Sequence, residues 1–394
     1  MKKLFLSLLG IIFAFSFILN IGFTNLKANA VTLDDGDQTL KLSARSAILI
    51  DKESGSVLYE NNADARLPVA SMTKTMTLLL TFEAIQRGEA NMDDIVNISS
   101  YSASQEGSEC FLDAGKDYKL YDLIKAVVIA SANDACVAIA EHLAGTDELF
   151  ASKMNKRANE LKLLNTNFKN STGLHEDGHY SSARDIAQVM AKLSEFEEYV
   201  KLARIWMDKI VHTGGRETEL VNTNRLIRNF KDCICGKTGY TDEAMYCLVS
   251  VAKRQNMTLV SCVIGERTKE DRFEDCVKLF NYGFSSFEAM NIIEKDKPIT
   301  YIKVKGAREK SYPVFIDDDV KVVTKKGEGL NIETKINLKD NLKAPINKGC
   351  EVGELEVYKN GVEISKRRII TNEDIDKNSF KDCFIEEANN FRRM

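Results

Sequence analysis

Histidine is scarce in this chain of 394 residues, which contains only His142, His175, His179 and His212. His142 follows an alanine-rich stretch and is typical of a helix end. His175 and His179 lie in the loop-like stretch NSTGLHEDGHYSSARD. No acidic residue stands at triad spacing from them, so the sequence offers no evident serine–histidine–aspartate triad.

The chain also lacks a Cys-x-x-Cys pair and an excess of basic residues. Without that cysteine spacing a structural zinc site is not expected, and the nine cysteines form no disulfide framework. We predict that most of them are buried as small apolar residues. Cys233 and Cys235 stand two apart on a predicted strand and are expected to share one face. The formal net charge of −4 argues against sequence-independent binding of nucleic acid.

The N-terminus carries the pattern of an export signal. Lys2 and Lys3 precede an apolar run over residues 4–19, and Ala28-Asn29-Ala30 is a small-x-small cleavage pattern. We predict a signal peptide over residues 1–30. An uncleaved membrane anchor is the alternative, but the run falls short of the about 20 residues that span a bilayer. The protein is therefore expected outside the cytoplasm, on the extracytoplasmic face of the cell envelope.

Strand and helix patterns alternate in the part that follows. Residues 44–60 predict two strands around a turn, and residues 119–144 predict two apolar helices broken at Ser-Ala-Asn 131–133. Residues 234–265 predict three strands, and a helix follows them. The simplest fold is of the α/β (α+β) class, a mainly antiparallel sheet flanked by helices over residues 31–287.

Residues 295–375 have a different texture, with short alternating strands and a hairpin that turns on Asn360-Gly361. They predict a smaller all-β C-terminal domain that serves as a spacer or packing module. The tail, residues 379–394, places apolar side chains on one helical face. It fits either contact with a membrane surface or packing against the β domain.

The stretch LPVASMTKTMTLLL carries the first chemical signal. We expect a helix that starts near Ala70 and ends at Gly88, so Ser71 and Lys74 lie one turn apart on the same face. A capping serine followed by an unrelated lysine is the plain alternative. A serine nucleophile needs a base, and a lysine acts as one when desolvation or a second cation lowers its pKa.

Two further motifs supply that context. Lys237, in Gly-Lys-Thr-Gly on a predicted strand, is the candidate second cation. Its flanking glycines are expected to let a ligand's backbone approach. Ser131 offers a hydroxyl for proton relay, and Asn133 offers an amide for a substrate amide. Ser-x-x-Lys, Ser-x-Asn and Lys-Thr-Gly, in this order, form a set known from class A β-lactamases and penicillin-binding proteins.

With these motifs the sequence resembles the low-molecular-mass penicillin-binding proteins that are D-alanyl-D-alanine carboxypeptidases. The blocks SANDACVAIAEHLAG, NTNFKNSTGLHEDGHYSSARD, NTNRL and GKTGYTDEAMYCLVS carry the resemblance over nearly all of the mature chain. Met245 departs from it, since a glycine is expected after the alanine of that strand. The resemblance implies a β-lactamase/transpeptidase-like fold, no cofactor, and a role in cell-wall biogenesis and cell shape.

The resemblance also implies roles for single residues. Ser71 attacks the carbonyl between the terminal D-alanines of a peptidoglycan stem peptide and forms an acyl-enzyme, with Lys74 as proton acceptor. Ser131 returns a proton to the leaving D-alanine, and Asn133 holds the peptide amide. Lys237 and Thr238 are expected to bind the substrate carboxylate, and Gly239 and Tyr240 are expected to contact the substrate along the strand. The backbone N–H groups of Ser71 and Tyr240 form the expected oxyanion site. Penicillins acylate the same serine as covalent inhibitors.

Three alternatives remain at this point. A class A β-lactamase needs an additional Glu-x-x-Leu-Asn, and ELKLLN at 160–165 has one residue too many. A peptidase that cuts crosslinks is compatible with the same motifs. A β-lactam sensor needs a transmembrane signalling region, and the sequence offers only the N-terminal apolar segment for one. A non-catalytic wall-binding protein is expected to have lost a motif residue, and every motif residue is present.

Overall fold

The computed structural model describes residues 40–378. The predicted signal peptide and the predicted amphipathic tail lie outside the described residues. Within residues 40–378, no helix has the length and apolar character that crossing a bilayer requires.

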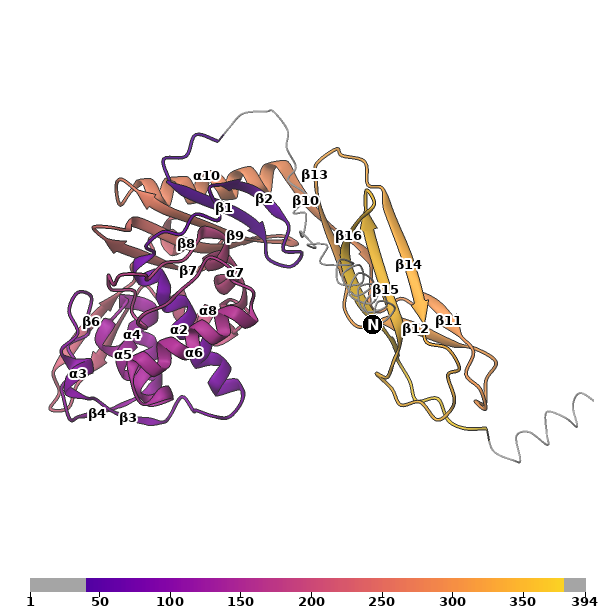
Figure 1. Ribbon diagram of the computed structural model, residues 1–394, viewed down its shortest axis with the longest axis horizontal. Coiled ribbons are helices and arrows are strands. Elements are labelled where there is room, and N and C mark those ends of the chain that lie inside the picture. Colours follow the sequence, from indigo (N-terminus) through magenta and orange to yellow (C-terminus); the bar gives the residue numbers. More distant parts are fainter. Residues whose placement is uncertain (1–39, 379–394) are drawn as a thin grey trace, which may run out of the picture. The chain divides into compact units, whose positions relative to one another are not determined.

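A five-stranded antiparallel sheet with the order β2-β1-β9-β8-β7 forms the centre of the first part of the chain (Figure 1). Its strands are β1 (Ser46–Asp51), β2 (Val57–Asn61), β7 (Cys233–Thr241), β8 (Met245–Arg254) and β9 (Met257–Glu266). The strands predicted at 44–60 and 234–265 are confirmed. Strand β7 forms one edge of this sheet.

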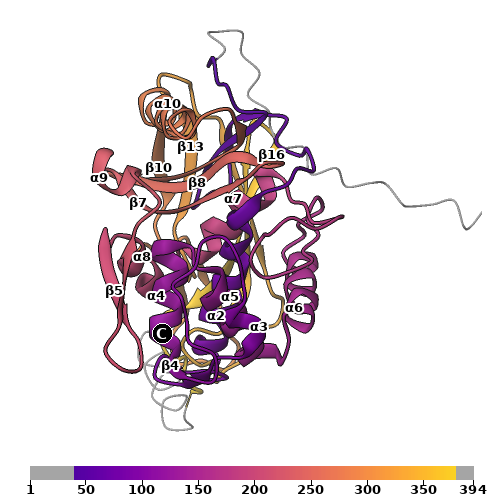
Figure 2. The same ribbon diagram turned by 90° about the vertical axis from the view of Figure 1, so that its left-hand side faces the viewer.

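Helices cover both faces of the sheet, because side chains along each strand alternate between two cores. In β1, Ile48 and Ile50 join the core under most of the helices, whereas Ala47 and Leu49 join the core under α10. Figures 1 and 2 show α10 on one side of the sheet and the other long helices on the opposite side. The helices are η1 (Ala70–Thr73), α2 (Lys74–Gln86), α4 (Leu120–Ala130), α5 (Asn133–Ala144), α6 (Asp147–Glu160), α7 (Ala183–Leu193), α8 (Glu197–Ala203) and α10 (Asp271–Ser286).

Short elements complete this part of the chain. They are β3 (Ile95–Asn97), α3 (Ser100–Ala103), β4 (Asp117–Lys119), β5 (Met207–Val211), β6 (Glu217–Val221) and α9 (Leu226–Asn229). Strands β3 and β4 pair with each other, as do β5 and β6.

The prediction that Cys233 and Cys235 share one face is wrong. The register of β7 against β8 shifts between them, so that Cys233 lies opposite Ala252 and Cys235 lies opposite Val251. The extra residue of this β-bulge sends the two side chains to different cores. In the described part of the chain, all cysteines except the exposed Cys350 are buried, and none is in a disulfide. The prediction of buried, apolar-like cysteines is confirmed for them.

Met245, the departure from the family pattern, begins β8 with a φ of 56°. This left-handed conformation costs a residue with a side chain about 1–2 kcal/mol, which explains why glycine is expected there. Met245 pairs with Thr241 at the end of the β7–β8 hairpin. The consequence is therefore local strain in the turn, while the strands on either side remain paired.

The second part of the chain is all-β. One sheet has the order β11-β12-β16-β15-β14, and β10 pairs with β13. The strands are β10 (Phe287–Ile293), β11 (Thr300–Ile302), β12 (Tyr312–Ile316), β13 (Val320–Lys325), β14 (Ile332–Leu338), β15 (Glu351–Lys359) and β16 (Val362–Thr371). The hairpin predicted at Asn360-Gly361 joins β15 to β16. A separate apolar cluster forms the interior of this part, and the predicted fold class is confirmed.

Candidate active site

Ser71 lies in the 3₁₀ turn η1, which continues directly into α2 at Lys74. The lysine Nζ donates a hydrogen bond of 2.9 Å to Ser71 Oγ, so the predicted contact between the two side chains is present. Ala70, just before the serine, has a φ of 48°. The turn that carries the serine is thus entered through a strained residue, which persists only where its surroundings hold it.

Lys74 is completely buried, and two contacts in addition to that with Ser71 explain how it is held. Besides Ser71, its Nζ donates to Asn133 Oδ1 at 2.6 Å and to the carbonyl oxygen of Thr172 at 2.7 Å. Burial lowers the pKa of Lys74 to about 8, because desolvation disfavours the ammonium form. A substantial fraction of this lysine is therefore neutral near pH 7.5 and can accept a proton from the serine.

Ser131 and Lys237 form a second hydroxyl–amine pair. Ser131 follows the end of α4 with a φ of 63°, and its Oγ accepts a hydrogen bond of 2.7 Å from Lys237 Nζ. The same Nζ donates to the carbonyl oxygen of Thr238 at 3.0 Å. Lys237 is 1% exposed and is not among the residues that line the cavity described below. Its head group is therefore directed at Ser131.

The effect between the two lysines runs in the opposite direction from the predicted one, in which the charge of Lys237 lowers the pKa of Lys74. Burial, followed by the charges of Lys74 and Arg272, lowers the pKa of Lys237 well below its ordinary value. The pKa of Lys74 is lowered by burial, while the acidic groups Asp134 and Asp147 oppose this effect. The repulsion between the lysines thus favours loss of the proton from Lys237, and burial alone accounts for the basicity of Lys74.

Asn133 connects the two motifs at the start of α5. Its Oδ1 accepts from Lys74, its Nδ2 donates to the carbonyl oxygen of Glu106 at 2.5 Å, and its backbone N–H donates to the carbonyl oxygen of Ser108 at 2.6 Å. The side chain therefore orients the lysine, a task that the sequence did not indicate.

Gly173 is a supporting residue that sequence reasoning missed. Its φ is +82°, and a Cβ at this position would lie 1.9 Å from the carbonyl oxygen of Ala70 and 2.7 Å from Thr73 Oγ1. The preceding residue, Thr172, supplies the carbonyl that accepts from Lys74. The only signal in the sequence was a glycine within the NSTGL block, which the pattern did not connect with Ser71.

The glycines of β7 have a physical reason other than the predicted approach of a ligand. A Cβ on Gly239 would lie 2.8 Å from the carbonyl oxygen of Val69 and 3.3 Å from the backbone nitrogen of Met72. A Cβ on Gly236 would lie 2.7 Å from the carbonyl oxygen of Val249. These glycines let the strand pack closely against the serine turn and against β8.

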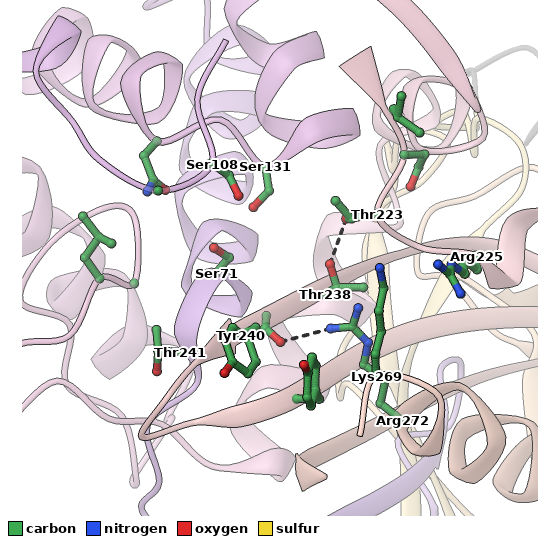
Figure 3. Close-up of a pocket in the computed structure, with 18 of the residues that line it drawn as sticks. Ser71, Ser108, Ser131, Thr223, Arg225, Thr238, Tyr240, Thr241, Lys269 and Arg272 are labelled. Carbon is green, nitrogen blue, oxygen red and sulfur yellow. Dashed lines mark hydrogen bonds between the residues drawn. The ribbon is translucent and has the colours of Figure 1, made fainter. Parts of the chain in front are cut away.

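A cavity of about 700 Å³ opens over these groups (Figure 3). Ser71, Ser108 and Ser131 face one another on one side of it, and Thr238 and Thr223 are joined by a hydrogen bond of 2.8 Å between their hydroxyls on the other. The cavity is lined by Ser71, Gly107, Ser108, Ser131, Asn133, Gly173, Leu174, Trp206, Val221, Asn222, Thr223, Arg225, Thr238, Gly239, Tyr240, Thr241, Tyr246, Lys269 and Arg272. All five of Ser71, Ser131, Asn133, Thr238 and Tyr240 are thus brought together.

Three cations, which the sequence did not single out, lie at the Thr238 end of this cavity: Arg225, Lys269 and Arg272 (Figure 3). Arg272 is 4% exposed, and its Nη1 donates to the carbonyl oxygen of Gly239 at 3.2 Å. Burial lowers the pKa of Arg272 to about 10, so the guanidinium remains charged at neutral pH. This end of the cavity is therefore suited to an anionic group.

Comparison with known proteins identifies the architecture. A family model described as "D-alanyl-D-alanine carboxypeptidase" matches residues 33–268, and one described as "Penicillin-binding protein 5, C-terminal domain" matches residues 287–377. The chain belongs to the D-alanyl-D-alanine carboxypeptidase family. It is 40% identical over 355 residues to D-alanyl-D-alanine carboxypeptidase DacF of Bacillus subtilis, which covers 89% of this chain and 91% of the relative.

Other carboxypeptidases agree with this assignment. D-alanyl-D-alanine carboxypeptidase DacC of Escherichia coli is 33% identical over 364 residues, covering 89% of this chain and 90% of the relative. The crystal structure of penicillin-binding protein 5 from Haemophilus influenzae matches with a TM-score of 0.72 and 30% identity, covering 87% of this chain and 100% of that one. The predicted low-molecular-mass penicillin-binding family and its serine carboxypeptidase class are confirmed.

The structure also explains the misleading β-lactamase pattern at residues 160–165. Glu160 is the last residue of α6, and its carboxylate pairs with Arg157 of the same helix at 3.1 Å. It is not among the residues that line the cavity. As predicted, this carboxypeptidase uses the stretch as a helix end.

Proposed function

We propose that this protein removes the terminal D-alanine from peptidoglycan stem peptides through an acyl-enzyme on Ser71. The observation that carries the proposal is the 2.9 Å contact between Ser71 Oγ and the amine of the fully buried Lys74. An amine whose pKa lies near 8 is a competent base at neutral pH. A capping serine beside an ordinary surface lysine would have neither the contact nor the burial.

Acylation begins when Ser71 Oγ attacks the carbonyl carbon between the two D-alanines and its proton passes to Lys74 Nζ. The C–N bond then breaks, and the leaving amine takes a proton through Ser131 Oγ. Lys237 donates to that oxygen at 2.7 Å and so orients the hydroxyl for the transfer. The product is an ester between Ser71 and the shortened peptide.

Substrate binding uses the edge position of β7 in the sheet. An edge strand presents backbone N–H and C=O groups to which an extended peptide can pair. Thr238, Gly239 and Tyr240 belong to this strand, and Asn133 lines the same cavity. The terminal carboxylate binds beside Thr238, where Lys269 and the other cations supply positive charge. Lys237 acts here through Ser131.

Charge that develops on the carbonyl oxygen is stabilised by the backbone N–H groups of Ser71 and Tyr240, as an oxyanion site. Water then attacks the ester, the ester C–O bond breaks and Ser71 regains its proton. Penicillins acylate the same serine, and their adduct leaves slowly because the ring fragment stays attached and obstructs water.

We further propose the setting of this chemistry. Residues 1–30 direct export, residues 31–287 form the catalytic domain, residues 295–375 form a β spacer, and residues 379–394 contact a membrane surface. The activity trims peptidoglycan at the extracytoplasmic face of the envelope and so contributes to cell-wall biogenesis and cell shape.

The test is release of free D-alanine from a peptide ending in D-Ala-D-Ala by the purified protein. Ser71→Ala is expected to abolish release, and penicillin is expected to block the wild-type protein. Ser104→Ala is the matched control, since Ser104 is exposed and lies outside the cavity. Rapid hydrolysis of penicillin without release of D-alanine would indicate a β-lactamase. Labelling by penicillin with neither reaction would indicate a non-catalytic binding protein.

A further inference from the structure

A loop of fifteen residues, 167–181, encloses the serine turn from one side. Its ends are tied together by the bridge between Asn167 and Tyr180, and Ser181 pairs with Leu67 just before the turn. We call this segment the 167–181 loop. From within it, Gly173 packs on Ala70 and the carbonyl of Thr172 accepts from Lys74. The loop therefore contacts the turn on both sides of Ser71.

The 167–181 loop makes one more contact with the turn, through a histidine that the proposed mechanism does not use. His179 is 8% exposed, and its Nε2 lies 2.8 Å from Thr73 Oγ1. Thr73 stands between Ser71 and Lys74 in the sequence and is itself fully buried. His179 thus contacts one of the two residues that join Ser71 to Lys74 along the turn, so that movement of Thr73 is expected to shift both reacting side chains.

The protonation state of this histidine follows from its other ring nitrogen. The backbone N–H of Lys169 donates to His179 Nδ1 at 3.2 Å, and an N–H can only donate. Nδ1 is therefore the acceptor nitrogen, the proton resides on Nε2, and Nε2–H donates to Thr73 Oγ1. The ring of Phe168 packs edge-on against the imidazole and fixes its plane.

The surroundings keep the imidazole neutral. Burial lowers the pKa of His179 to about 4, and the basic side chains that face it, His175 and Lys169 from the loop and Lys74 from α2, act in the same direction. The donor to Thr73 consequently stays in place over the whole range in which Lys74 is able to act as a base.

We propose that His179 is a positioning residue for acylation: it holds Thr73, and through Thr73 it fixes the turn in which Ser71 and Lys74 meet. The turn needs such support, because 3₁₀ geometry makes poorer backbone hydrogen bonds than an α-helix and because Ala70 is strained. The inference rests on the proposed function of Ser71 and Lys74.

The test separates binding from chemistry in the reaction with a fluorescent penicillin, measured by stopped flow over a range of penicillin concentrations. Loss of the contact in His179→Leu and in Thr73→Val is expected to lower the limiting acylation rate about tenfold or more. The half-saturating concentration should stay within about threefold, since misplacing a reacting group costs rate more than binding. His179→Gln, whose amide can both donate to Thr73 and accept from Lys169, should restore most of the rate.

A double-mutant cycle makes the test specific. If both residues act through one hydrogen bond, His179→Leu combined with Thr73→Val lowers the rate no further than either change alone. His142→Leu is the control, because His142 lies at the end of α5 beside Asp94 and is expected to leave the rate unchanged.

Three results would overturn the inference: an unchanged rate in Thr73→Val, rate losses that multiply in the double variant, or a Gln variant as slow as the Leu variant. A His179→Leu protein that does not fold leaves the Thr73→Val and His179→Gln arms to decide. Failure of the proposed function is distinguishable, since wild-type protein would then release no free D-alanine from a peptide ending in D-Ala-D-Ala, whatever the acylation rates of the variants.

Discussion

Replacing Gly173 with alanine tests whether the 167–181 loop controls the position of the serine. The added Cβ would lie 1.9 Å from the carbonyl oxygen of Ala70 and 2.5 Å from its carbonyl carbon. To reach an ordinary contact the oxygen has to move by about 1 Å or more. Because Ala70 immediately precedes Ser71, the displacement passes directly to the nucleophile.

The expected magnitude has two parts. Alanine at a φ of +82° costs about 1–2 kcal/mol of folding free energy. A shift of about 1 Å in a reacting group costs about 10²-fold in rate. Gly178 provides a matched control in the same loop, with a φ of +80° and only an ordinary 3.4 Å contact between its added Cβ and the side chain of Lys169. Gly178→Ala should therefore lose a similar amount of folding free energy, while its added Cβ does not contact the serine turn.

The assay is the limiting rate of acylation by a fluorescent penicillin, with thermal unfolding measured in parallel. We expect Gly173→Ala to acylate about 10²-fold more slowly than the wild-type protein and Gly178→Ala to stay within about twofold. Similar stability losses in the two variants, with acylation of both near the wild-type rate, would refute the reasoning.

Three further predictions follow from other features. Acylation should rise about tenfold per pH unit below the pKa of Lys74, about 8, and level off above it, because only the neutral amine accepts a proton; a rate that is flat from pH 6 to pH 8 contradicts this. Met245→Gly should raise the free energy of unfolding by about 0.5–1 kcal/mol, since it removes the backbone strain of a side-chain-bearing residue at a φ of 56°. Met245→Ala keeps that strain and should not raise the free energy of unfolding. Urea denaturation of both proteins tests this prediction. Lys269→Met should raise KM for a D-Ala-D-Ala peptide about threefold to tenfold with kcat little changed. Lys253→Met should have no effect, because Lys253 is also exposed but does not line the cavity. An unchanged KM for Lys269→Met would show that this lysine does not contact the substrate carboxylate.

The sequence was sufficient wherever the information is local. The spacing of Ser71 and Lys74 predicts their contact, since helical geometry alone brings residues three apart together. Short apolar runs bounded by turn residues in β1 and at 234–265 predict the strands. The runs are nearly continuous and are buried throughout β1 and β9, which agrees with a sheet that is covered on both faces. The three motifs and the family resemblance then predicted that distant segments meet in one site.

The missed features depend on contacts that the sequence does not encode locally. His179 meets Thr73 across 106 residues, and Thr172 meets Lys74 across 98. Contacts between residues so far apart leave no periodic pattern in the sequence. A glycine or histidine in a loop can serve many different purposes, so its presence alone did not indicate these contacts. The sequence did not predict the bulge between Cys233 and Cys235, because the expected alternation of side chains assumes strand pairing without an inserted residue.

The central claim is that Ser71 is the acylated residue, and peptide mapping by mass spectrometry after brief exposure to penicillin tests it most directly. The account predicts a single adduct on the peptide that contains Ser71, and no adduct in Ser71→Ala. An adduct on Ser131, or one that persists at full yield in Ser71→Ala, would contradict it.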